Sequence, residues 1–322
     1  MPGSLVDFDK MKLFIILALA AACVLAKPAN EVSEIEPSFD AYRDVRLLLS
    51  TRRNRGAPYQ ISFRNLDNIR NSPFDATKPT RVLVHGWWED DTSDISVGTS
   101  EELLNYYDFN VIFVDWSEGG QTINYAAAAG RVEAVGFFVA SQLNWMRENN
   151  LINFDRVHVI GFSLGAHIAG FVGKNTQGQL DTIIGLDPAG PLFNERNPGG
   201  RIDAADARYV ECLHTNGGLI GAGFGSAICQ ADFFPNGGAS QPGCLTNTCS
   251  HLRAVSFYIE AIIDNAFHSV RCDSELQASR ENCNSGGGQW FADTNNAARR
   301  LNGIFHFATN RNPPFAQGPV RP

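Results

Sequence analysis

The serine best placed to act as a nucleophile in this chain stands between two glycines. Ser163 lies in the sequence Gly-Phe-Ser-Leu-Gly, which follows a strand-like run at 157–160 and precedes a helix-compatible run at 166–174. This GxSxG pattern between a strand and a helix is typical of a sharp turn that lifts a serine hydroxyl above a sheet, where flanking glycines remove Cβ atoms that would clash. We therefore expect Ser163 to be a nucleophile.

A serine hydroxyl becomes reactive when a histidine takes its proton and an acid orients that histidine. Asp187 ends the next strand-like run, 182–186, and Pro188 turns the chain immediately afterwards. We expect the Asp187 carboxylate at the carboxyl edge of the sheet, where it can orient a histidine. The alternative is a turn aspartate that bonds its own backbone.

Seven histidines compete for the role of base. Where the chain order is serine, acid, histidine, the base must follow Asp187. This order leaves His214, His251, His268 and His306. His214 closes a strand-like run and His251 stands where a helix begins, whereas the other two lie in weakly patterned segments. We favour His251, because a base on the loop that enters a helix can reach over the serine, and His214 stays open.

Catalysis by such a group also needs two backbone N–H donors aimed at the negative charge that develops on the reacting carbonyl oxygen. One donor normally belongs to the residue after the nucleophile, here Leu164, and the other to the loop after an early strand. The segment 84–88 is that loop, because Gly86 lets the backbone come close. Trp87 is the expected second donor. The alternative is that Trp87 and Trp88 are only core or surface aromatics.

The elements that must position these residues are visible as short apolar runs that alternate with segments of helical periodicity. The runs expected to form buried parallel strands are 81–84, 111–114, 157–160 and 182–186. Apolar spacing of three and four residues predicts helices over 132–146 and 252–262, with Asn149 and Asn150 ending the first and Ser250 available to cap the second. The alternation predicts an α/β fold with a mostly parallel central sheet flanked by helices.

The N-terminal residues have the pattern of a secretory signal. Lys12 precedes an apolar run at 13–25, which is too short to span a membrane, and Ala26 is the expected cleavage point. Met11 is an alternative start of translation. We expect a signal peptide at 1–26, a loose mature N-terminus at 27–43, one domain at 44–310 and an irregular tail at 311–322. The protein is then expected to be secreted and extracellular, without a transmembrane segment.

Cysteine usage fits that compartment. Removing the signal would remove Cys23 and leave six cysteines, an even number typical of an oxidising environment. Their order suggests three local pairs, Cys212 with Cys229, Cys244 with Cys249, and Cys272 with Cys283. No CxxC pair or HExxH sequence is present, so zinc is not expected. Nucleic acid is not an expected partner either, because 34 acidic residues outweigh 26 basic ones and no polybasic run occurs.

These motifs, in this order, resemble the pancreatic-lipase family of secreted lipid hydrolases, and within it the insect lipases and the wasp-venom phospholipases A1. The resemblance runs from about Asp44 to the region 272–283. It rests on Val-His-Gly at 84–86, Val-Asp-Trp at 114–116, Gly-Phe-Ser-Leu-Gly-Ala-His at 161–167, Gly-Leu-Asp-Pro-Ala at 185–189 and Cys-Ser-His-Leu-Arg at 249–253. It implies an α/β-hydrolase fold, with Ser163 as nucleophile, Asp187 as orienting acid, His251 rather than His214 as base, and Trp87 and Leu164 at the oxyanion hole.

The chain departs from the larger members of that family at three points. Only 71 residues follow His251 in the 322-residue chain, so the C-terminal PLAT-type β-sandwich is expected to be absent. Trp87 stands where phenylalanine is usual, which changes a wall of the acyl pocket. Only four residues separate Cys244 from Cys249, where the larger lipases carry a long amphipathic lid.

The resemblance also raises the question of calcium. Some larger members place a calcium ion near the segment 198–206, and Arg201, Asp203 and Asp206 match that site, whereas Pro198 stands where a glutamate would be. The proline carbonyl could still serve as a ligand. We expect no obligatory cofactor, with calcium at this segment as the alternative.

The resemblance implies a carboxylic ester hydrolase that acts on phospholipid or acylglycerol at a lipid interface. The short segment between Cys244 and Cys249 favours phospholipase A1, because an open site admits a bulky polar head group. A triacylglycerol lipase of the same family is one alternative. A catalytically silent lipid-binding or yolk-type protein is the other, and the presence of serine, acid and histidine favours the enzyme over it.

Overall fold

The computed structural model describes residues 38–283, 285–290, 292 and 300–318. The expected signal peptide at 1–26 lies outside these residues, as does most of the segment 27–43. The expected domain start at residue 44 falls inside helix α2 (Ala41–Asp44), whose N-cap Asp40 accepts a hydrogen bond from the Tyr42 N–H. A capped turn of helix therefore precedes the first strand.

One mixed sheet of 11 strands runs through the described part of the chain, in the order β10-β9-β11-β8-β7-β6-β5-β3-β4-β1-β2. The strands are β1 (Arg46–Ser50), β2 (Tyr59–Ile61), β3 (Thr80–Val84), β4 (Asn110–Asp115), β5 (Val157–Phe162), β6 (Thr182–Leu186), β7 (Val210–Leu213), β8 (Ala231–Pro235), β9 (His268–Cys272), β10 (Ser285–Trp290) and β11 (Gly303–Phe307). The strands from β4 through β3, β5, β6, β7 and β8 to β11 are parallel, and the outer pairs are antiparallel.

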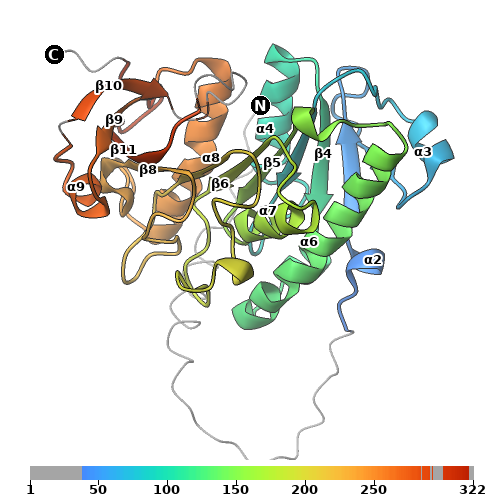
Figure 1. Ribbon diagram of the computed structural model, residues 1–322, viewed down its shortest axis with the longest axis horizontal. Coiled ribbons are helices and arrows are strands. Elements are labelled where there is room, and N and C mark those ends of the chain that lie inside the picture. Colours follow the sequence, from blue (N-terminus) through green and yellow to red (C-terminus); the bar gives the residue numbers. More distant parts are fainter. Residues whose placement is uncertain (1–37, 284, 291, 293–299, 319–322) are drawn as a thin grey trace, which may run out of the picture.

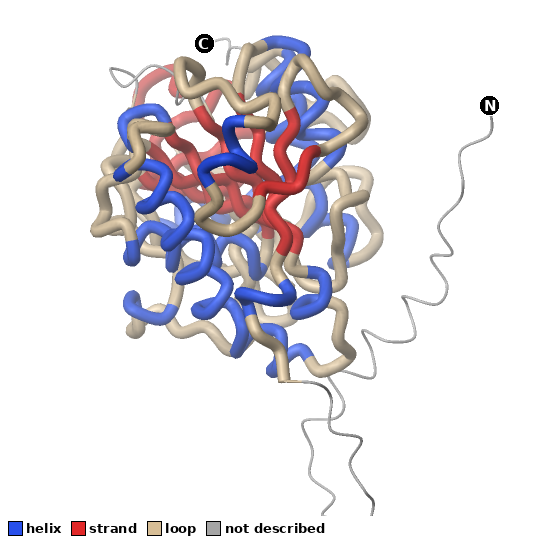
Figure 2. The backbone as a smooth tube through the Cα atoms, turned by 90° about the vertical axis from the view of Figure 1, so that its right-hand side faces the viewer, coloured by secondary structure: helices blue, strands red, loops and turns tan. Residues whose placement is uncertain are grey.

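Helices cover both faces of this sheet (Figures 1 and 2). The long helices are α4 (Val97–Tyr106), α6 (Tyr125–Glu148), α7 (Leu164–Asn175) and α8 (Asn247–Ile263), and the short ones are α3 (Leu66–Arg70), α5 (Ser117–Gly120) and α9 (Glu275–Ser279). Helices α6 and α7 pack on the face that carries Val82 and Val84, whereas α4 and α8 pack on the face that carries Leu83. Successive side chains of a strand point to opposite faces, so each central strand supplies both cores.

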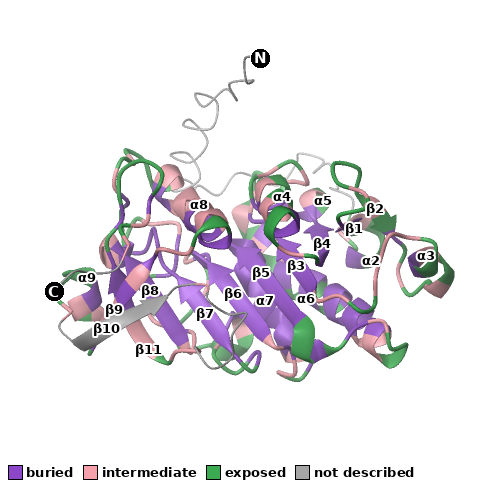
Figure 3. Ribbon diagram, turned by 90° about the horizontal axis from the view of Figure 1, so that it is seen from above, coloured by how far each residue is buried: buried purple, intermediate pink, exposed green. Residues whose placement is uncertain are grey.

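The central strands are buried along their whole length (Figure 3). This burial explains why they read as continuous apolar runs rather than as alternating ones. The four expected strands correspond to β3, β4, β5 and β6, each extended by no more than two residues at an end. The predicted α/β fold class, with a mostly parallel sheet flanked by helices, is confirmed.

The helix boundaries show one correct expectation and one error. Helix α6 ends at Glu148 with Asn149 as its C-cap, as the two asparagines predicted. Helix α8, however, begins at Asn247 with Thr246 as its N-cap, because the Thr246 side chain accepts a hydrogen bond from the Cys249 N–H. Ser250 instead accepts a hydrogen bond from the Gln241 N–H, so the expected cap at Ser250 is wrong. His251 consequently lies one turn inside the helix.

The remaining expectations on organisation concern the tail and the membrane. Residues 311–318 contain no helix or strand, although the buried Phe315 donates its N–H to Glu260, and the residues after 318 lie outside the description. Within the described ranges, no helix combines the length and the apolar character that a membrane crossing demands.

Candidate active site

Ser163 occupies the turn between β5 and α7, at the carboxyl end of a central strand. Its φ of 56° and ψ of −120° are rare for a residue with a side chain, and such strain is typical of a nucleophile held above a sheet. A Cβ at Gly161 would lie 2.1 Å from the Gly165 carbonyl oxygen, so the first glycine of the pattern is required by this close approach. The Ser163 N–H donates to the Leu186 carbonyl at 3.0 Å, which ties the turn to β6.

Asp187 follows β6 directly and is fully buried. Its Oδ1 accepts hydrogen bonds from the Thr215 N–H at 2.7 Å and the Asn216 N–H at 3.1 Å, and its Oδ2 lies 2.5 Å from His251 Nδ1. Because Oδ2 is an acceptor, His251 Nδ1 carries the hydrogen, and Nε2 is left as the basic atom. The structure therefore brings Asp187 together with His251, one of the two histidines that local sequence left open as the base.

His251 also packs beside the serine turn. Its ring lies 4.6 Å, between ring centroids, from Phe162, the residue that precedes Ser163. Among the described residues, the Ser163 hydroxyl makes no hydrogen bond. Hydrogen bonds of this kind are often long before substrate binds and tighten with it, so the arrangement is compatible with proton transfer from Ser163 to His251.

The loop after β3 faces the same turn. Within the described part of the chain, neither the Trp87 N–H nor the Leu164 N–H donates a hydrogen bond. Leu164 is the first residue of α7, so its N–H has no partner inside the helix and carries the positive end of the helix dipole. The indole of Trp87 is fixed separately, because its Nε1–H donates to the Thr122 carbonyl at 2.8 Å and its ring meets Tyr125 edge to face at 5.2 Å.

Two side chains, the buried His85 and the half-buried Glu89, hold this loop in place. His85 Nε2 accepts the Trp116 N–H at 3.0 Å, so His85 Nδ1 carries the hydrogen that it donates to the Gly86 carbonyl at 2.8 Å. Glu89 Oε2 accepts the Gly86 N–H, also at 2.8 Å. Burial raises the pKa of Glu89 above its ordinary value, while the bond from Gly86 and the nearby histidines oppose that rise. The peptide groups on either side of Gly86 are thus fixed by His85 and Glu89.

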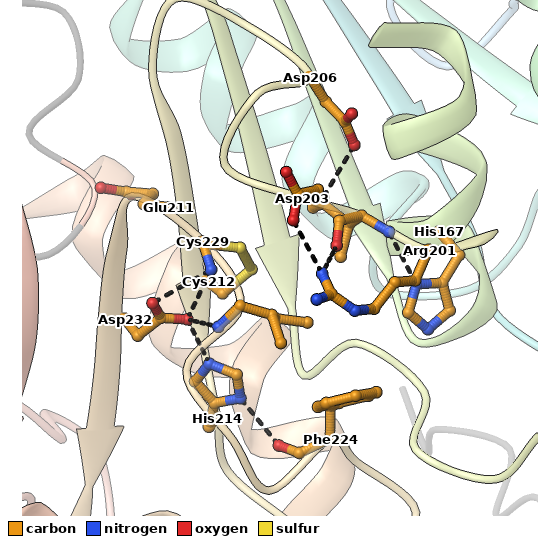
Figure 4. Close-up of a disulfide and its surroundings, with 12 residues drawn as sticks. His167, Arg201, Asp203, Asp206, Glu211, Cys212, His214, Phe224, Cys229 and Asp232 are labelled. Carbon is orange, nitrogen blue, oxygen red and sulfur yellow. Dashed lines mark hydrogen bonds and ion pairs between the residues drawn. A yellow bond between two sulfur atoms is a disulfide. The ribbon is translucent and has the colours of Figure 1, made fainter. Parts of the chain in front are cut away.

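His214, the competing candidate base, lies between Asp232 and the Phe224 carbonyl (Figure 4). It is fully buried, with Nδ1 2.8 Å from the Phe224 carbonyl and Nε2 2.9 Å from Asp232 Oδ1. Since both partners are acceptors, His214 carries hydrogens on both nitrogens. Burial alone would lower the pKa of His214, but the hydrogen bond to Asp232 and its charge raise that pKa above its ordinary value. Both ring nitrogens of His214 are thus occupied by buried partners, which disfavours His214 as the candidate base.

The structure joins the cysteines in the three pairs that their order along the chain suggested, namely Cys212 with Cys229, Cys244 with Cys249 and Cys272 with Cys283. Among the described residues, the cysteine, histidine and acidic side chains whose ligand atoms converge are Cys212, Cys229 and Asp232. Both sulfurs of that group belong to a disulfide, so it offers no thiolate to a metal. Near the serine, the Cys244–Cys249 disulfide closes the loop that leads into α8.

The expected calcium segment does not fit a calcium ion. The Lys174 ammonium donates to the Arg201 carbonyl at 2.7 Å and to the two carboxylate oxygens of Asp206 at 2.6 and 2.7 Å. Asp203 is also engaged, because its Oδ2 accepts from Arg201 Nη1 at 3.2 Å and its Oδ1 from the Ala205 N–H at 3.2 Å. The ammonium already lies at hydrogen-bond distance from three of the oxygens that a calcium ion would need, and its positive charge would repel the ion.

Sequence reasoning overlooked Glu89, Asp232 and Lys174. Each of these side chains bonds a partner residue that the order of residues in the chain does not identify. Glu89 stands three residues after Gly86 in the expected oxyanion loop, which was a usable signal, because a carboxylate at that spacing can accept the Gly86 N–H. Asp232 and Lys174 lie 18 and 27 residues from their partners His214 and Arg201, and no local pattern links them.

Residues 24–289 match the model of a family described as Lipase. The chain belongs to the pancreatic-lipase family. The resemblance drawn from the motifs is thereby confirmed.

Individual relatives give the extent of the likeness. Pancreatic triacylglycerol lipase of Mus musculus is 33% identical over 271 residues, which cover 77% of this chain and 58% of that protein. Lipase member H of Danio rerio is 37% identical over 227 residues, which cover 68% of this chain and 49% of that protein. The chain spans about half the length of the curated relatives it matches.

Proposed function

We propose that this lipase-family chain is a serine carboxylic ester hydrolase that acts on glycerolipids. The observation that carries the proposal is the 2.5 Å contact between His251 Nδ1 and Asp187 Oδ2, made beside the strained turn that presents Ser163. In this proposal Ser163 is the nucleophile, His251 the base and Asp187 the acid that orients it, and the Trp87 and Leu164 N–H groups form the oxyanion hole.

The reaction proceeds through an acyl-enzyme. Ser163 Oγ attacks the ester carbonyl while His251 Nε2 takes its proton, and the resulting oxyanion accepts hydrogen bonds from Trp87 and Leu164. His251 then returns the proton to the departing alcohol, which leaves the acyl group on Ser163. Water, deprotonated by His251, releases the fatty acid in the second half. Asp187 holds one tautomer of His251 throughout and stabilises the imidazolium that forms.

Within that class we favour phospholipase A1 activity, which releases the sn-1 acyl chain of a phospholipid. Of the four residues between Cys244 and Cys249, Leu245 is exposed, Thr246 caps α8, and Asn247 is already helical. A loop this short, closed by a disulfide, has no room for a covering helix, since one helical turn takes 3.6 residues. A polar head group then has access to Ser163, whereas a long-chain triacylglycerol lacks the apolar contact of a lid.

Exposed apolar side chains beside the site support a lipid substrate. Leu219 and Ile220 protrude from the loop that follows Asn216, a neighbour of Asp187, and Leu245 protrudes from the loop that precedes α8. The two loops touch, because Asn247 Nδ2 donates to the Ile220 carbonyl at 2.7 Å. We call Leu219, Ile220 and Leu245 the apolar rim. Large apolar side chains gathered at a surface mark a site of interaction, and a lipid surface suits these three.

The three cysteine pairs support secretion into an oxidising compartment.

The test compares the purified protein with its Ser163→Ala variant on phosphatidylcholine and on long-chain triacylglycerol, both presented as mixed micelles. We expect wild type to release free fatty acid and lysophospholipid from phosphatidylcholine, and phosphatidylcholine with different sn-1 and sn-2 chains identifies the bond that breaks. Loss of the nucleophile lowers turnover by about 10⁶-fold in other enzymes with such triads. The variant must retain the thermal unfolding midpoint of wild type, because a methyl group fits where the hydroxyl was.

Three other outcomes would change the proposal. Higher kcat/KM on triacylglycerol than on phosphatidylcholine would favour a triacylglycerol lipase, the activity named in the murine relative. Release of the sn-2 chain would exclude the A1 assignment. If wild type and variant were equally inactive on both substrates while both bound lipid vesicles, the chain would be a lipid-binding protein without catalysis.

A further inference from the structure

A single lysine side chain fills an oxygen cluster at the far end of the helix that begins after Ser163. Lys174 is the penultimate residue of α7. Its Nζ lies 2.7 Å from the Arg201 carbonyl oxygen, 2.6 Å from Asp206 Oδ1 and 2.7 Å from Asp206 Oδ2. These three donations use the full hydrogen-bonding capacity of an ammonium group. The side chain of Lys174 is 23% exposed and that of Asp206 only 4%, so the pair is largely shielded from water.

The acceptors are of the kind that hard divalent cations select. One backbone carbonyl and one bidentate carboxylate supply three of the six to eight oxygen ligands that calcium takes. A carboxylate this buried is costly to ionise without a cation beside it. A positive charge beside Asp206 therefore stabilises the cluster, and the Lys174 ammonium supplies that charge.

The cluster joins α7 to the loop 188–206 that returns past the serine turn. The same loop is fastened near the start of α7, where His167 Nδ1 accepts the Ile202 N–H at 3.2 Å and Nε2–H donates to the Ala189 carbonyl at 2.7 Å. A Cβ at Gly173 would lie 2.2 Å from the Asp206 carbonyl oxygen, so the loop rests directly on the helix backbone. Lys174 also stands in the last turn of α7, where a cation is favoured by the helix dipole.

We propose that the Lys174 ammonium replaces a divalent cation in this cluster, so that the loop 188–206 is held by an internal charge and the folded protein has no calcium requirement. A metal stabilises a fold in proportion to its free concentration, because it binds the native state by mass action. A cation attached to the chain is present at every calcium concentration. The inference concerns the fold, and its test is read from unfolding, so it stands or falls independently of ester hydrolysis.

The experiment measures the thermal unfolding midpoint of wild type, Lys174→Met and Lys78→Met, each with EDTA and with about 5 mM calcium chloride, a concentration above the dissociation constants of extracellular calcium modules. Lys78→Met is the matched control, because Lys78 also forms a lysine–aspartate pair, 2.7 Å from Asp108, but on the surface. Methionine keeps the length of the side chain and removes the charge.

We expect wild type and Lys78→Met to unfold within about 1 °C of each other, with and without calcium, since an exposed ion pair contributes little. Lys174→Met should unfold about 5–10 °C lower in EDTA, because it leaves a buried carboxylate unpaired. Calcium should raise the midpoint of Lys174→Met by about 3 °C and leave wild type unchanged, because only the variant has free oxygens.

Several results would overturn the proposal. Stabilisation of wild type by calcium, or destabilisation by EDTA, would show that the ion and the ammonium do not exclude each other. A Lys174→Met midpoint equal to that of Lys78→Met, or one that calcium fails to raise, would show that the ammonium does not act in place of a metal. If Lys174→Met does not fold, calorimetric titration of wild type with calcium decides alone, because binding with a dissociation constant of about 1 mM or below contradicts the proposal.

Discussion

His214 Nε2 lies 2.9 Å from Asp232 Oδ1, and the two side chains form a second buried acid–histidine pair behind the pair of Asp187 and His251. The Thr215 and Asn216 N–H groups, which follow His214 in the chain, are the donors to Asp187 Oδ1. On the other side, Asp232 accepts the Cys229 N–H, which ties it to the Cys212–Cys229 disulfide (Figure 4). The second pair thus fixes the backbone that orients the candidate acid.

The first prediction concerns this second pair. His214→Gln should lower kcat by about 10- to 100-fold with little change in KM, because a small displacement of Asp187 misaligns His251. His306→Gln is the matched control, since His306 is also buried and its Nδ1 bonds the Phe234 carbonyl on β8, and its kcat should stay within twofold. Equal kcat values in the two variants would contradict a positioning role for His214.

The pH dependence of stability supplies an independent readout for the same variant. The pKa of folded His214 is raised above 6.5, so the stability that its protonation contributes is complete below pH 6.5 and is lost as the pH rises through the folded pKa. The difference in free energy of unfolding between wild type and His214→Gln should therefore shrink at high pH, as measured by urea unfolding. A difference that does not change with pH would indicate a purely steric effect.

The second prediction concerns Asp187. Asp187→Asn should lower kcat by about 10⁴-fold, because an amide nitrogen facing His251 Nδ1 stabilises the tautomer that carries its hydrogen on Nε2, the atom needed as base. The amide oxygen can still accept the Thr215 and Asn216 N–H groups, so the unfolding midpoint should change little. Activity within tenfold of wild type in the folded variant would remove Asp187 from the proposed triad.

The third prediction tests the loop that carries Trp87. Glu89→Ala should lower kcat by about tenfold, because it frees the Gly86 N–H and loosens the peptide that precedes the proposed oxyanion donor. Glu89→Gln retains an acceptor oxygen at the same reach and should keep most of the activity. Steady-state kinetics on one phospholipid substrate distinguish them, and equal losses in both variants would point to a role of the negative charge instead.

The fourth prediction follows from His167, whose pKa burial lowers to about 3 from an ordinary 6.5. Between these values the unfolded chain binds a proton that folded His167 does not, so its contribution to stability is complete above pH 6.5 and is lost as the pH falls. As the pH falls from 6 to 4.5, the free energy of unfolding of wild type should decrease. In His167→Gln this decrease should be smaller by about 1.4 kcal/mol per pH unit. His268→Gln serves as the control, and an equal slope in both variants would refute the assignment.

The fifth prediction concerns the apolar rim. Replacing Leu219, Ile220 and Leu245 together by serine should lower the rate on phosphatidylcholine vesicles by at least about tenfold, because about 0.8 kcal/mol is lost for each methylene no longer buried in lipid. The rate on a soluble short-chain ester should stay within twofold. Phe137→Ser is the control, because Phe137 is exposed on α6, away from the rim loops.

The open site leads to one further expectation for the wild-type enzyme. Its rate should rise little when a short-chain phospholipid passes from monomers to micelles, because no lid needs to open. A steep increase at the micellar concentration, together with a preference for long-chain triacylglycerol, would contradict the open-site argument.

The sequence by itself determined the α/β architecture and the positions of the candidate catalytic residues along it. Three buried strands were recognisable as continuous apolar runs, at 81–84, 157–160 and 182–186. Their residues are apolar without alternation because helices cover both faces of a parallel sheet. Ser163 and Asp187 were recognisable because each follows such a strand at a forced turn. These signals are local, since strand burial and turn chemistry depend on residues a few positions apart.

Only the tertiary structure decided which histidine meets Asp187 and what the buried charges do. His214 and His251 both follow Asp187 in the chain. The parallel pairing of β7 with β8 places His214 beside Asp232, whereas α8 brings His251 to Asp187. The bond from Lys174 to the Arg201 carbonyl likewise joins residues 27 positions apart. Contacts over such separations depend on how strands pair and helices dock, and that information is spread over the whole core rather than carried by either residue.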